Sequence, residues 1–286
     1  MHSVLVTGGS GSFGQAFVKH LLTHTNPPHR IAVLSRGERA QAEMAQAFKP
    51  LDDAPGGDPR LRFFIGDVRD RDRLRRAMEG IEVVVHAAAL KRIEVGAYNP
   101  TEMVKTNILG TMNVIEAATD AGIKKVVGLS SDKAWQPISP YGQSKALAEM
   151  LLLSANNTRG AKGPIFSVTR YGNVWKSNGS VVPKWLQMIA SGASRVPVTD
   201  VNCTRFFMTM DEAVRLVLTT INEMSGGELK IPALPAYRLG DIVEAMGVEA
   251  DVVGLPKYEK LHESMCESLS SDKARRMSID ELRAAL

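Results

Sequence analysis

Four residues able to move protons lie close together in residues 130–145, which read SSDKAWQPISPYGQSK. An adjacent acid and base, Asp132 and Lys133, are followed by Tyr141 and Lys145, which stand four residues apart. A tyrosine phenol, with an ordinary pKa of about 10, is a poor base at neutral pH, but a neighbouring ammonium lowers that pKa. The alternative is an exposed turn with a weak ion pair. The surrounding elements decide between the two.

The first part of the chain predicts strands that alternate with helices. The expected strands are 3–9, 30–36, 61–68, 81–89, 124–131 and 165–174, and the expected helices are 13–24, 39–48, 70–79, 107–121 and 140–156. Several strands are apolar without alternation, as in strands that helices cover on both faces. The order therefore predicts an α/β fold, a Rossmann-type doubly wound parallel sheet.

A smaller lobe is expected after Val174, where loops, short helices and scattered prolines replace the regular pattern. We divide the chain into a Rossmann domain of residues 1–174, to which residues 204–226 return, and a smaller C-terminal substrate-binding lobe of residues 175–203 and 227–286. Residues 49–60, rich in proline, glycine and aspartate, are interpreted as a surface loop without chemistry of its own.

Composition excludes several classes of function. The 286 residues are 44% hydrophobic, and lysine plus arginine exceed aspartate plus glutamate by 35 − 31 = +4 without a dense basic block, which favours small anionic ligands over nucleic acid. Cys203 and Cys266 form neither a CxxC motif nor a disulfide framework. There is no signal-peptide pattern, and no apolar run approaches the roughly 18–20 residues that span a bilayer. We expect a soluble, cytoplasmic protein with no bound metal and no membrane partner.

Glycines 8, 11 and 14 lie between the first expected strand and the first expected helix. Glycine is needed where the backbone turns tightly beside a pyrophosphate, whose charge the helix N-terminus stabilises. A glycine triplet alone is a weak signal, but this position favours a dinucleotide over an ordinary turn. We expect the cofactor to contact Thr7, Gly8, Gly11, Ser12, Phe13, Gly14, Ser35, Arg36, Asp67, Val68, Ala87, Ala88 and Lys145.

The end of the second strand indicates which dinucleotide binds. A carboxylate there would bind a ribose 2′-hydroxyl, whereas a basic side chain would accept a 2′-phosphate. The chain has Ser35, Arg36 and Arg39 in this region, and an arginine fork suits a phosphate. We therefore predict NADP rather than NAD; solvated arginines at a helix start are the alternative.

The catalytic residues follow the fifth expected strand of this sheet, and ligands of such sheets bind beyond the carboxyl ends of the strands. Ser131, Asp132 and Lys133 are therefore expected near the nicotinamide. Tyr141 and Lys145 are at positions i and i+4 of the next helix and face one side of it. Such a tyrosine can take the proton of a sugar hydroxyl while hydride leaves the same carbon.

These motifs resemble the extended short-chain dehydrogenase/reductase superfamily. Over roughly residues 3–268 the chain is similar to the inverting UDP-N-acetylglucosamine 4,6-dehydratases of polysaccharide and pseudaminic acid biosynthesis, in FFIGDVRD, HAAALK, YNPTEMVKTN, SSDKA, YGQSK, RYGNV, GSVVP, TRFF and EKLHE.

The resemblance implies a cycle in which the cofactor is regenerated. Tyr141 would deprotonate the 4-hydroxyl as hydride leaves carbon 4, Lys133 would remove the proton on carbon 5, and protonated Asp132 would help the 6-hydroxyl leave as water. Hydride then returns to carbon 6. Lys133 must be neutral to act as a base, so we expect burial, Lys145 or the cofactor to lower its pKa.

The resemblance also implies substrate-binding positions, which are Lys91, Asn107, Tyr171, Asn173, Val181, Arg205 and Glu259. A solvated lysine at a helix start is an equally good interpretation of Lys91, and a structural ion pair competes with a phosphate contact for Arg205. His86 and His262 are interpreted as structural.

Three departures from the family lie on the substrate side. Residues 175–180 read WKSNGS where members commonly carry a glycine and an arginine, and LPKYEKLHE lacks the arginine and glycine of the family's RPGEKLHE. Trp135, next to the catalytic residues, is larger than expected. The chemistry is thus inherited more firmly than the substrate, so another nucleotide or hexose, or a 5,6-dehydratase that stops at an alkene, stays open.

Two further readings stay open. A nucleotide-sugar epimerase would share Tyr141 and Lys145 but has no need of the Asp132–Lys133 pair. A non-catalytic NADP-binding regulator could share the fold, but it has no need of all four residues. We expect a homo-oligomer, as is usual for similar proteins.

Overall fold

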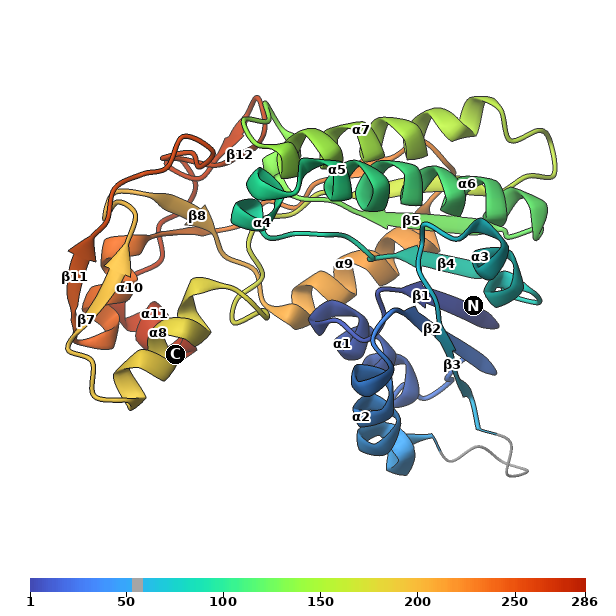
Figure 1. Cartoon of the computed structure of the whole chain (residues 1–286), viewed down its shortest axis with the longest axis horizontal. Coiled ribbons are helices and arrows are strands. Elements are labelled where there is room, and N and C mark those ends of the chain that lie inside the picture. Colours follow the sequence, from blue (N-terminus) through green and yellow to red (C-terminus); the bar gives the residue numbers. More distant parts are fainter. Residues whose placement is uncertain (53–58) are drawn as a thin grey trace.

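A parallel sheet of seven strands forms the centre of the molecule (Figure 1), shown by a computed structural model that describes residues 1–52 and 59–286. The strand order is β3-β2-β1-β4-β5-β6-β9, and each neighbouring pair is parallel. The bounds are Ser3–Thr7 (β1), Arg30–Ser35 (β2), Leu61–Ile65 (β3), Val83–His86 (β4), Lys125–Leu129 (β5), Ile165–Thr169 (β6) and Leu229–Lys230 (β9). The predicted Rossmann-type fold is confirmed.

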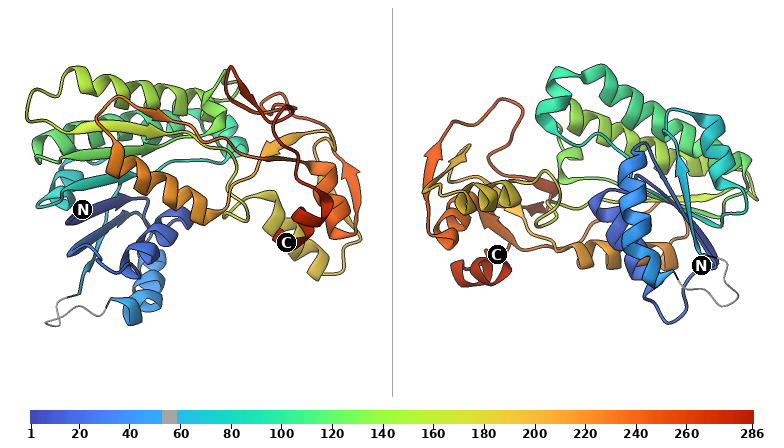
Figure 2. Two further views of the ribbon diagram at one scale, coloured as in Figure 1. Left: turned by 180° about the vertical axis from the view of Figure 1, so that it is seen from behind. Right: turned by 60° about the horizontal axis from the view of Figure 1, so that its bottom comes forward.

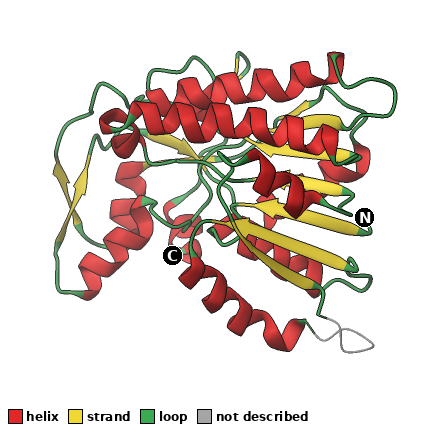
Figure 3. Cartoon of the chain, turned by 45° about the vertical axis from the view of Figure 1, so that its right-hand side comes forward, coloured by secondary structure: helices red, strands yellow, loops and turns green. Residues whose placement is uncertain are grey.

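Helices cover both faces of the sheet, as Figure 3 shows. One face carries α1 (Ser12–Leu22), α2 (Glu38–Phe48) and α9 (Met210–Glu223), and the other carries α3 (Arg71–Met78), α6 (Gly110–Asp120) and α7 (Pro140–Ser154). Val4 and Val6 of β1 belong to the core on the first face, whereas Leu5 belongs to the core on the second. Burial on both sides explains why the strands are apolar without alternation.

The segment between β4 and α6 is helical in four pieces. Three of these lie before α6, which are α4 (Ile93–Tyr98), α5 (Pro100–Met103) and the π-helical turns η2 (Val104–Leu109), and η2 runs directly into α6, the fourth. The helix expected at residues 107–121 therefore extends further towards the N-terminus. Short 3-10 turns occupy Lys49–Leu51 (η1), Asp132–Ala134 (η3) and Ala155–Asn157 (η4). The loop predicted at residues 49–60 lies in large part outside the described residues.

A smaller group of elements lies beside the carboxyl ends of the sheet strands (Figure 2). Its helices are α8 (Val181–Ala190), α10 (Leu239–Met246) and α11 (Ile279–Ala285), and its paired strands are β7 (Arg195–Val198) with β11 (Glu249–Val252), β8 (Thr204–Phe206) with β10 (Ala236–Arg238), and β12 (Ser264–Cys266) with β13 (Leu269–Ser270). A separate core holds this group together, with Trp185, Ile242 and Leu282 buried in it. The sheet also takes in β9, which lies in a stretch assigned from sequence to the smaller lobe.

Among the described residues, none of the helices combines the length and the apolar character that a membrane span requires.

Candidate active site

A cavity of about 830 Å³ lies between the carboxyl ends of the sheet strands and the smaller lobe. It extends from the glycine-rich turn after β1 to Lys133 and Tyr141, and most of the predicted site residues line it. Those at its wall are Gly8, Gly11, Ser12, Phe13, Gly14, Ser35, Arg36, Asp67, Val68, Ala87, Ala88, Lys91, Ser131, Lys133, Tyr141, Lys145, Tyr171, Asn173, Val181, Arg205 and Glu259. Thr7, Asn107 and Asp132 lie behind the wall and support it.

The turn after β1 requires glycine at two positions. Gly8 has a φ of +67°, and a Cβ on it would lie 2.8 Å from the Cα of Ala88. A Cβ on Gly14 would overlap the backbone of Gly9. Helix α1 begins at Ser12 directly after this turn, so its free N–H groups face the cavity. These residues form a cradle that fits a dinucleotide pyrophosphate.

Thr7 supports the cradle from below. Its side chain is fully buried, bonds Nδ1 of His86 at 2.8 Å and accepts a hydrogen bond from the backbone of Ala88 at 3.3 Å. The other ring nitrogen of His86 lies 3.1 Å from Thr111 Oγ1. His86 thus serves packing and hydrogen bonding, in line with the structural interpretation.

The end of β2 presents Ser35 and Arg36 to the cavity. The Ser35 hydroxyl accepts hydrogen bonds from Ser10 and Gln41, each at 2.9 Å. The Arg36 side chain is 56% exposed, and its guanidinium lies 4.0 Å from Asp67, at the end of β3. Among the residues that the structure describes, the guanidinium of Arg36 makes no hydrogen bond, so its donors can bind an anionic partner.

The turn η3 carries the acid and the base. The Ser131 hydroxyl caps it by accepting from the backbone of Lys133 and donating to Asp132 Oδ1 at 2.9 Å. Nζ of Lys133 lies 3.0 Å from Asp132 Oδ1 and 3.2 Å from Asn173 Oδ1. Asp132 is fully buried, and its second oxygen has no hydrogen-bond partner in the described chain.

The expected lowering of the Lys133 pKa is wrong for this structure. Burial alone would lower the pKa of the ammonium, but the carboxylates of Asp132 and Glu263 outweigh burial and raise that pKa well above its ordinary value. Lys133 is therefore an ammonium in this structure. It must pass a proton to another group before it can act as a base.

Helix α7 positions Tyr141 and Lys145. Ser139 caps the helix by accepting from Gly142, Pro140 occupies its first turn, and both functional side chains are buried. Lys145 Nζ donates to the carbonyl of Leu129 at 2.5 Å, and burial lowers the pKa of Lys145 to about 8 against the opposing charge of Glu149.

The lowered pKa expected for Tyr141 is also wrong here. Burial raises its pKa, and the charge of Lys133 and a hydrogen bond with Ser131 only partly oppose this effect. The ammonium that acts on the phenol is thus Lys133 rather than Lys145.

Of the predicted substrate residues, Lys91 and Tyr171 line the cavity without an ion pair in the described chain, whereas Arg205 is part of one. Lys91 lines the cavity and is exposed, and desolvation together with the charge of Arg92 lowers its pKa. Burial raises the pKa of Tyr171, which stays a neutral phenol. Arg205 is ion-paired with Glu259 and donates to the carbonyls of Thr204 and Leu261 at 2.7 Å and 3.1 Å, so a structural ion pair is present.

Asn107 holds the backbone of the cavity wall and does not face the cavity. Its amide accepts from the backbone of Leu90 at 2.8 Å and donates to the carbonyl of Leu90 and to Ser144, each at 2.9 Å. The contact to a sugar implied for this residue is thus replaced by support of the loop that carries Lys91.

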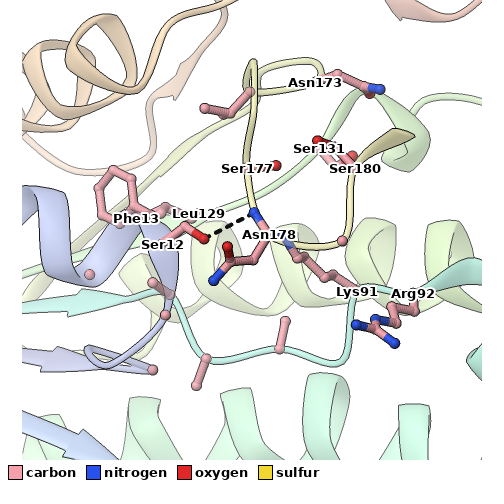
Figure 4. A pocket seen from close by; sticks show the side chains of 18 of the residues that line it. Ser12, Phe13, Lys91, Arg92, Leu129, Ser131, Asn173, Ser177, Asn178 and Ser180 are labelled. Atoms are coloured by element: carbon pink, nitrogen blue, oxygen red, sulfur yellow. Dashed lines mark hydrogen bonds between the residues drawn. The ribbon is translucent and has the colours of Figure 1, made fainter. Parts of the chain in front are cut away.

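The divergent loop 175–180 crosses the cavity and meets the glycine-rich turn. The backbone N–H of Asn178 donates to Ser12 Oγ at 3.1 Å, as Figure 4 shows, and Lys91 and Arg92 lie on the neighbouring wall. Trp135 stacks on Arg170 at 5.8 Å and is not part of the wall. His262 bonds Thr204 through Nδ1 at 2.9 Å, which agrees with a structural role.

Sequence reasoning missed three charged residues beside the site. Arg170 and Glu149 form a buried ion pair behind α7, with Nε of Arg170 2.9 Å from the carboxylate. Glu263 is 1% exposed and lies 3.4 Å from Lys133. The only sequence signal for Glu263 was its place at the end of the EKLHE motif. Within residues 1–52 and 59–286, no group of three or more His, Cys, Asp or Glu side chains is arranged to hold a metal ion.

The chain is similar to known proteins over most of its length. Residues 4–283 match the family model described as polysaccharide biosynthesis protein. The chain is 42% identical over 268 residues to a UDP-N-acetylglucosamine 4,6-dehydratase (inverting) of Campylobacter jejuni, covering 93% of this chain and 78% of that protein. It is 35% identical over 289 residues to a UDP-glucose 4-epimerase of Rickettsia rickettsii, covering 98% and 81%.

Solved structures share the fold. Pen from Bacillus thuringiensis has a TM-score of 0.91 and 32% identity, covering 99% of this chain and 97% of that one. The dTDP-glucose 4,6-dehydratase DesIV from Streptomyces venezuelae, solved with NAD and TYD bound, has a TM-score of 0.82 and 24% identity, covering 99% and 95%. The second likeness concerns the fold alone.

Proposed function

The chain belongs to the polysaccharide biosynthesis protein family, within the extended short-chain dehydrogenases/reductases, and from this premise we propose that it is an NADP-dependent nucleotide-sugar 4,6-dehydratase. Its proposed substrate is UDP-N-acetylglucosamine or a related nucleotide-hexose, with inversion at carbon 5. The observation that carries the proposal is the Asp132–Lys133 pair, in which Lys133 lies with Tyr141 at the wall of the cavity that also contains the glycine cradle and Asp132 lies directly behind it.

The cavity would hold both ligands. Gly8, Gly14 and the start of α1 would hold the pyrophosphate of the cofactor, and Ser35 with Arg36 would hold a 2′-phosphate. When bound, the nicotinamide would accept hydride from carbon 4 of the sugar and return it at carbon 6. The large sheet with α9 would hold the cofactor, and the smaller lobe would hold the nucleotide-sugar.

Oxidation would depend on Tyr141. Its phenol is neutral in this structure, so it would first give its own proton to solvent. As a phenolate stabilised by the charge of Lys133 and the bound cofactor, it would then take the proton of the 4-hydroxyl. Lys145 would orient the cofactor ribose, as its buried ammonium already lies at the end of β5.

Elimination would depend on Asp132 and Lys133. A proton shift from Lys133 Nζ to Asp132 Oδ1, over 3.0 Å, converts the ion pair into a neutral amine and a carboxylic acid. The amine then takes the proton from carbon 5, and the acid gives its proton to the leaving 6-hydroxyl, which departs as water. Both residues return to their original charges, so the proton count balances.

The proposal is tested by incubating the protein and NADP with a panel of nucleotide sugars in heavy water and recording mass spectra. A complete dehydratase gives a product that is lighter by water and carries solvent deuterium at carbon 5. An alkene product would reveal arrest after elimination. Absence of water loss from every hexose of the panel would refute the proposal.

A 4-epimerase is the second candidate, because relatives of that activity are 35% identical to this chain. An epimerase changes configuration without loss of water and has no use for an acid–base pair beside the sugar. The same mass spectra separate the two activities.

A further inference from the structure

Glu263 is a buried acid beside the proposed base and is not used in the reaction described above. It lies just before β12, whereas Lys133 is on η3, so the tertiary fold brings them together. Its Oε1 lies 3.4 Å from Lys133 Nζ, and its Oε2 lies 3.9 Å from Lys260 Nζ. Oε2 has no hydrogen-bond partner among the described residues.

The backbone of Glu263 is held firmly. Its N–H donates to Ser271 Oγ at 2.9 Å, and its carbonyl accepts from the N–H of Ser271 at 2.8 Å. The Ser271 hydroxyl in turn lies 2.6 Å from Thr204 Oγ1 of β8. These bonds hold the backbone of Glu263 beside β8 and next to β12, so only a change of its side-chain rotamer would move the carboxylate away from Lys133.

The charges around Lys133 are unequal. Asp132 and Glu263 contact its ammonium directly, Arg205 of β8 opposes them, and Lys260 offsets Glu263 at longer range. The neutral phenols of Tyr141 on α7 and Tyr237 on β10 complete the surroundings. Each of these two buried carboxylates has one oxygen without a hydrogen-bond partner among residues 1–52 and 59–286, and together they cost free energy unless a cation lies between them.

We infer that Glu263 is a positioning residue for Lys133, which holds the amine at the cavity wall and, together with Asp132, keeps it protonated between turnovers. This inference rests on the proposed function, in which Lys133 is the base. Because Glu263 favours the ammonium form of Lys133, the neutral amine arises only when Lys133 passes its proton to Asp132. The base and the acid of the elimination therefore arise in one step.

Competitive labelling with acetic anhydride, read by mass spectrometry, tests the inference without substrate. Only the neutral amine reacts, so the rate at a given pH reports its neutral fraction, which changes tenfold for each unit of pKa. In the unaltered protein we expect Lys133 at pH 8 to label at least about tenfold more slowly than Lys91, which lines the same cavity. Equal labelling of the two lysines would overturn the inference even if no variant folds.

Three variants then separate charge from packing. We expect Glu263→Gln to speed labelling of Lys133 by about tenfold or more, and Glu263→Asp, which keeps the charge, to stay near the unaltered rate. Equal acceleration in both variants would mean that Glu263 only fills space, and no change in Glu263→Gln would also overturn the inference. The matched control is Glu267→Gln, at an exposed position of the same segment, which should leave the rate unchanged.

Because the labelling needs no sugar, its outcome is independent of the heavy-water experiment. If Glu263→Gln does not speed the labelling of Lys133 while the unaltered protein is an active dehydratase, only the role of Glu263 is refuted and the proposed function stands. A charge effect without activity on any nucleotide sugar would refute the proposed function and leave Glu263 as the residue that fixes the charge of Lys133.

Discussion

At the scale of single residues, the proposed chemistry depends most on the amine of Lys133, which contacts Asp132 and Asn173 rather than the glycine cradle. Lys133→Ala should therefore keep NADP binding while deuterium exchange at carbon 5 falls by about 10²–10⁴-fold, the usual contribution of a general base. Cofactor binding is measured by calorimetry and exchange by mass spectrometry. Lys184→Ala, at an exposed position of α8, is the control. Exchange that survives in Lys133→Ala would exclude this residue as the base.

Arg36 is the residue on which cofactor selectivity should depend. Its side chain is half exposed at the cavity wall, with only a 4.0 Å contact to Asp67. Arg36→Asp removes the guanidinium and adds a carboxylate suited to a ribose 2′-hydroxyl, so the ratio of NADP to NAD affinity should fall by about tenfold or more. Calorimetric titration with both dinucleotides gives the ratio. Arg39→Ala should change it little, because Arg39 is 92% exposed and paired with Glu43. Unchanged NADP affinity in Arg36→Asp would argue for NAD.

His86 should make the stability of the fold depend on pH. Burial lowers its pKa to about 3, whereas an unfolded histidine has a pKa of about 6.5. Between these values the unfolded chain binds a proton that the folded chain does not. The stability that His86 contributes is thus complete above pH 6.5 and is lost as the pH falls towards 3, by about 1.4 kcal/mol per pH unit.

Urea unfolding at pH 8 and pH 5 measures this effect. From the lowered pKa of His86 we expect the free energy of unfolding to fall by about 2 kcal/mol between the two pH values on its account. His86→Gln should lower stability at pH 8 but lose this part of the pH dependence. Equal slopes in the unaltered protein and the variant would show that His86 is not kept neutral by the fold.

At the scale of elements, the π-helical turns Val104–Leu109 position the side chain of Asn107 against the loop after β4. Its side chain makes four hydrogen bonds, two of them to the backbone of Leu90. Asn107→Ala would leave these buried groups without partners and should lower the free energy of unfolding by about 2–4 kcal/mol. Urea unfolding measures the loss, and Asn99→Ala, an exposed asparagine nearby, should stay within about 0.5 kcal/mol. A small decrease in the free energy of unfolding of Asn107→Ala would mean that water takes over the hydrogen bonds of the missing amide.

Strands buried on both faces could be predicted from sequence, because their continuous apolar runs are visible without knowing which elements pack against them. Two-residue strands such as β9 carry no such pattern, and the helix before Asn107 was hidden by Gly96 and Pro100, which interrupt its sequence signal. The residues predicted for cofactor binding and proton transfer stand in short contiguous motifs, so their position around one cavity could be predicted as well. Glu263 lies 263 − 133 = 130 residues from Lys133 and reaches it only through the packing of β12 against η3. The raised pKa of Lys133 depends on that contact and could not be inferred locally.

At the scale of the whole molecule, an apolar surface on α7 and the helices beside it offers a site for self-association. Helices α6 and α7 lie side by side over one face of the sheet (Figure 1) and contact each other. Their outer sides, with η2, expose large apolar side chains, which are Val104, Leu109, Met112, Leu147 and Met150. Apolar side chains gathered on neighbouring elements mark interaction surfaces more often than single ones do. We therefore predict that the homo-oligomer expected from sequence forms through this surface.

Met150→Glu tests this prediction, since Met150 is 64% exposed and a charge there would be buried without a partner in the assembly. Light scattering after size exclusion should give a multiple of 31.1 kDa for the unaltered chain and a shift towards 31.1 kDa for the variant. Met188→Glu, on α8 of the smaller lobe and 36% exposed, is the matched control and should leave the mass unchanged. A monomeric unaltered chain at micromolar concentration would contradict self-association, and an oligomer that survives Met150→Glu would move the interface elsewhere. Because α7 also carries Tyr141 and Lys145, dissociation that lowers NADP affinity would further show that assembly steadies the site.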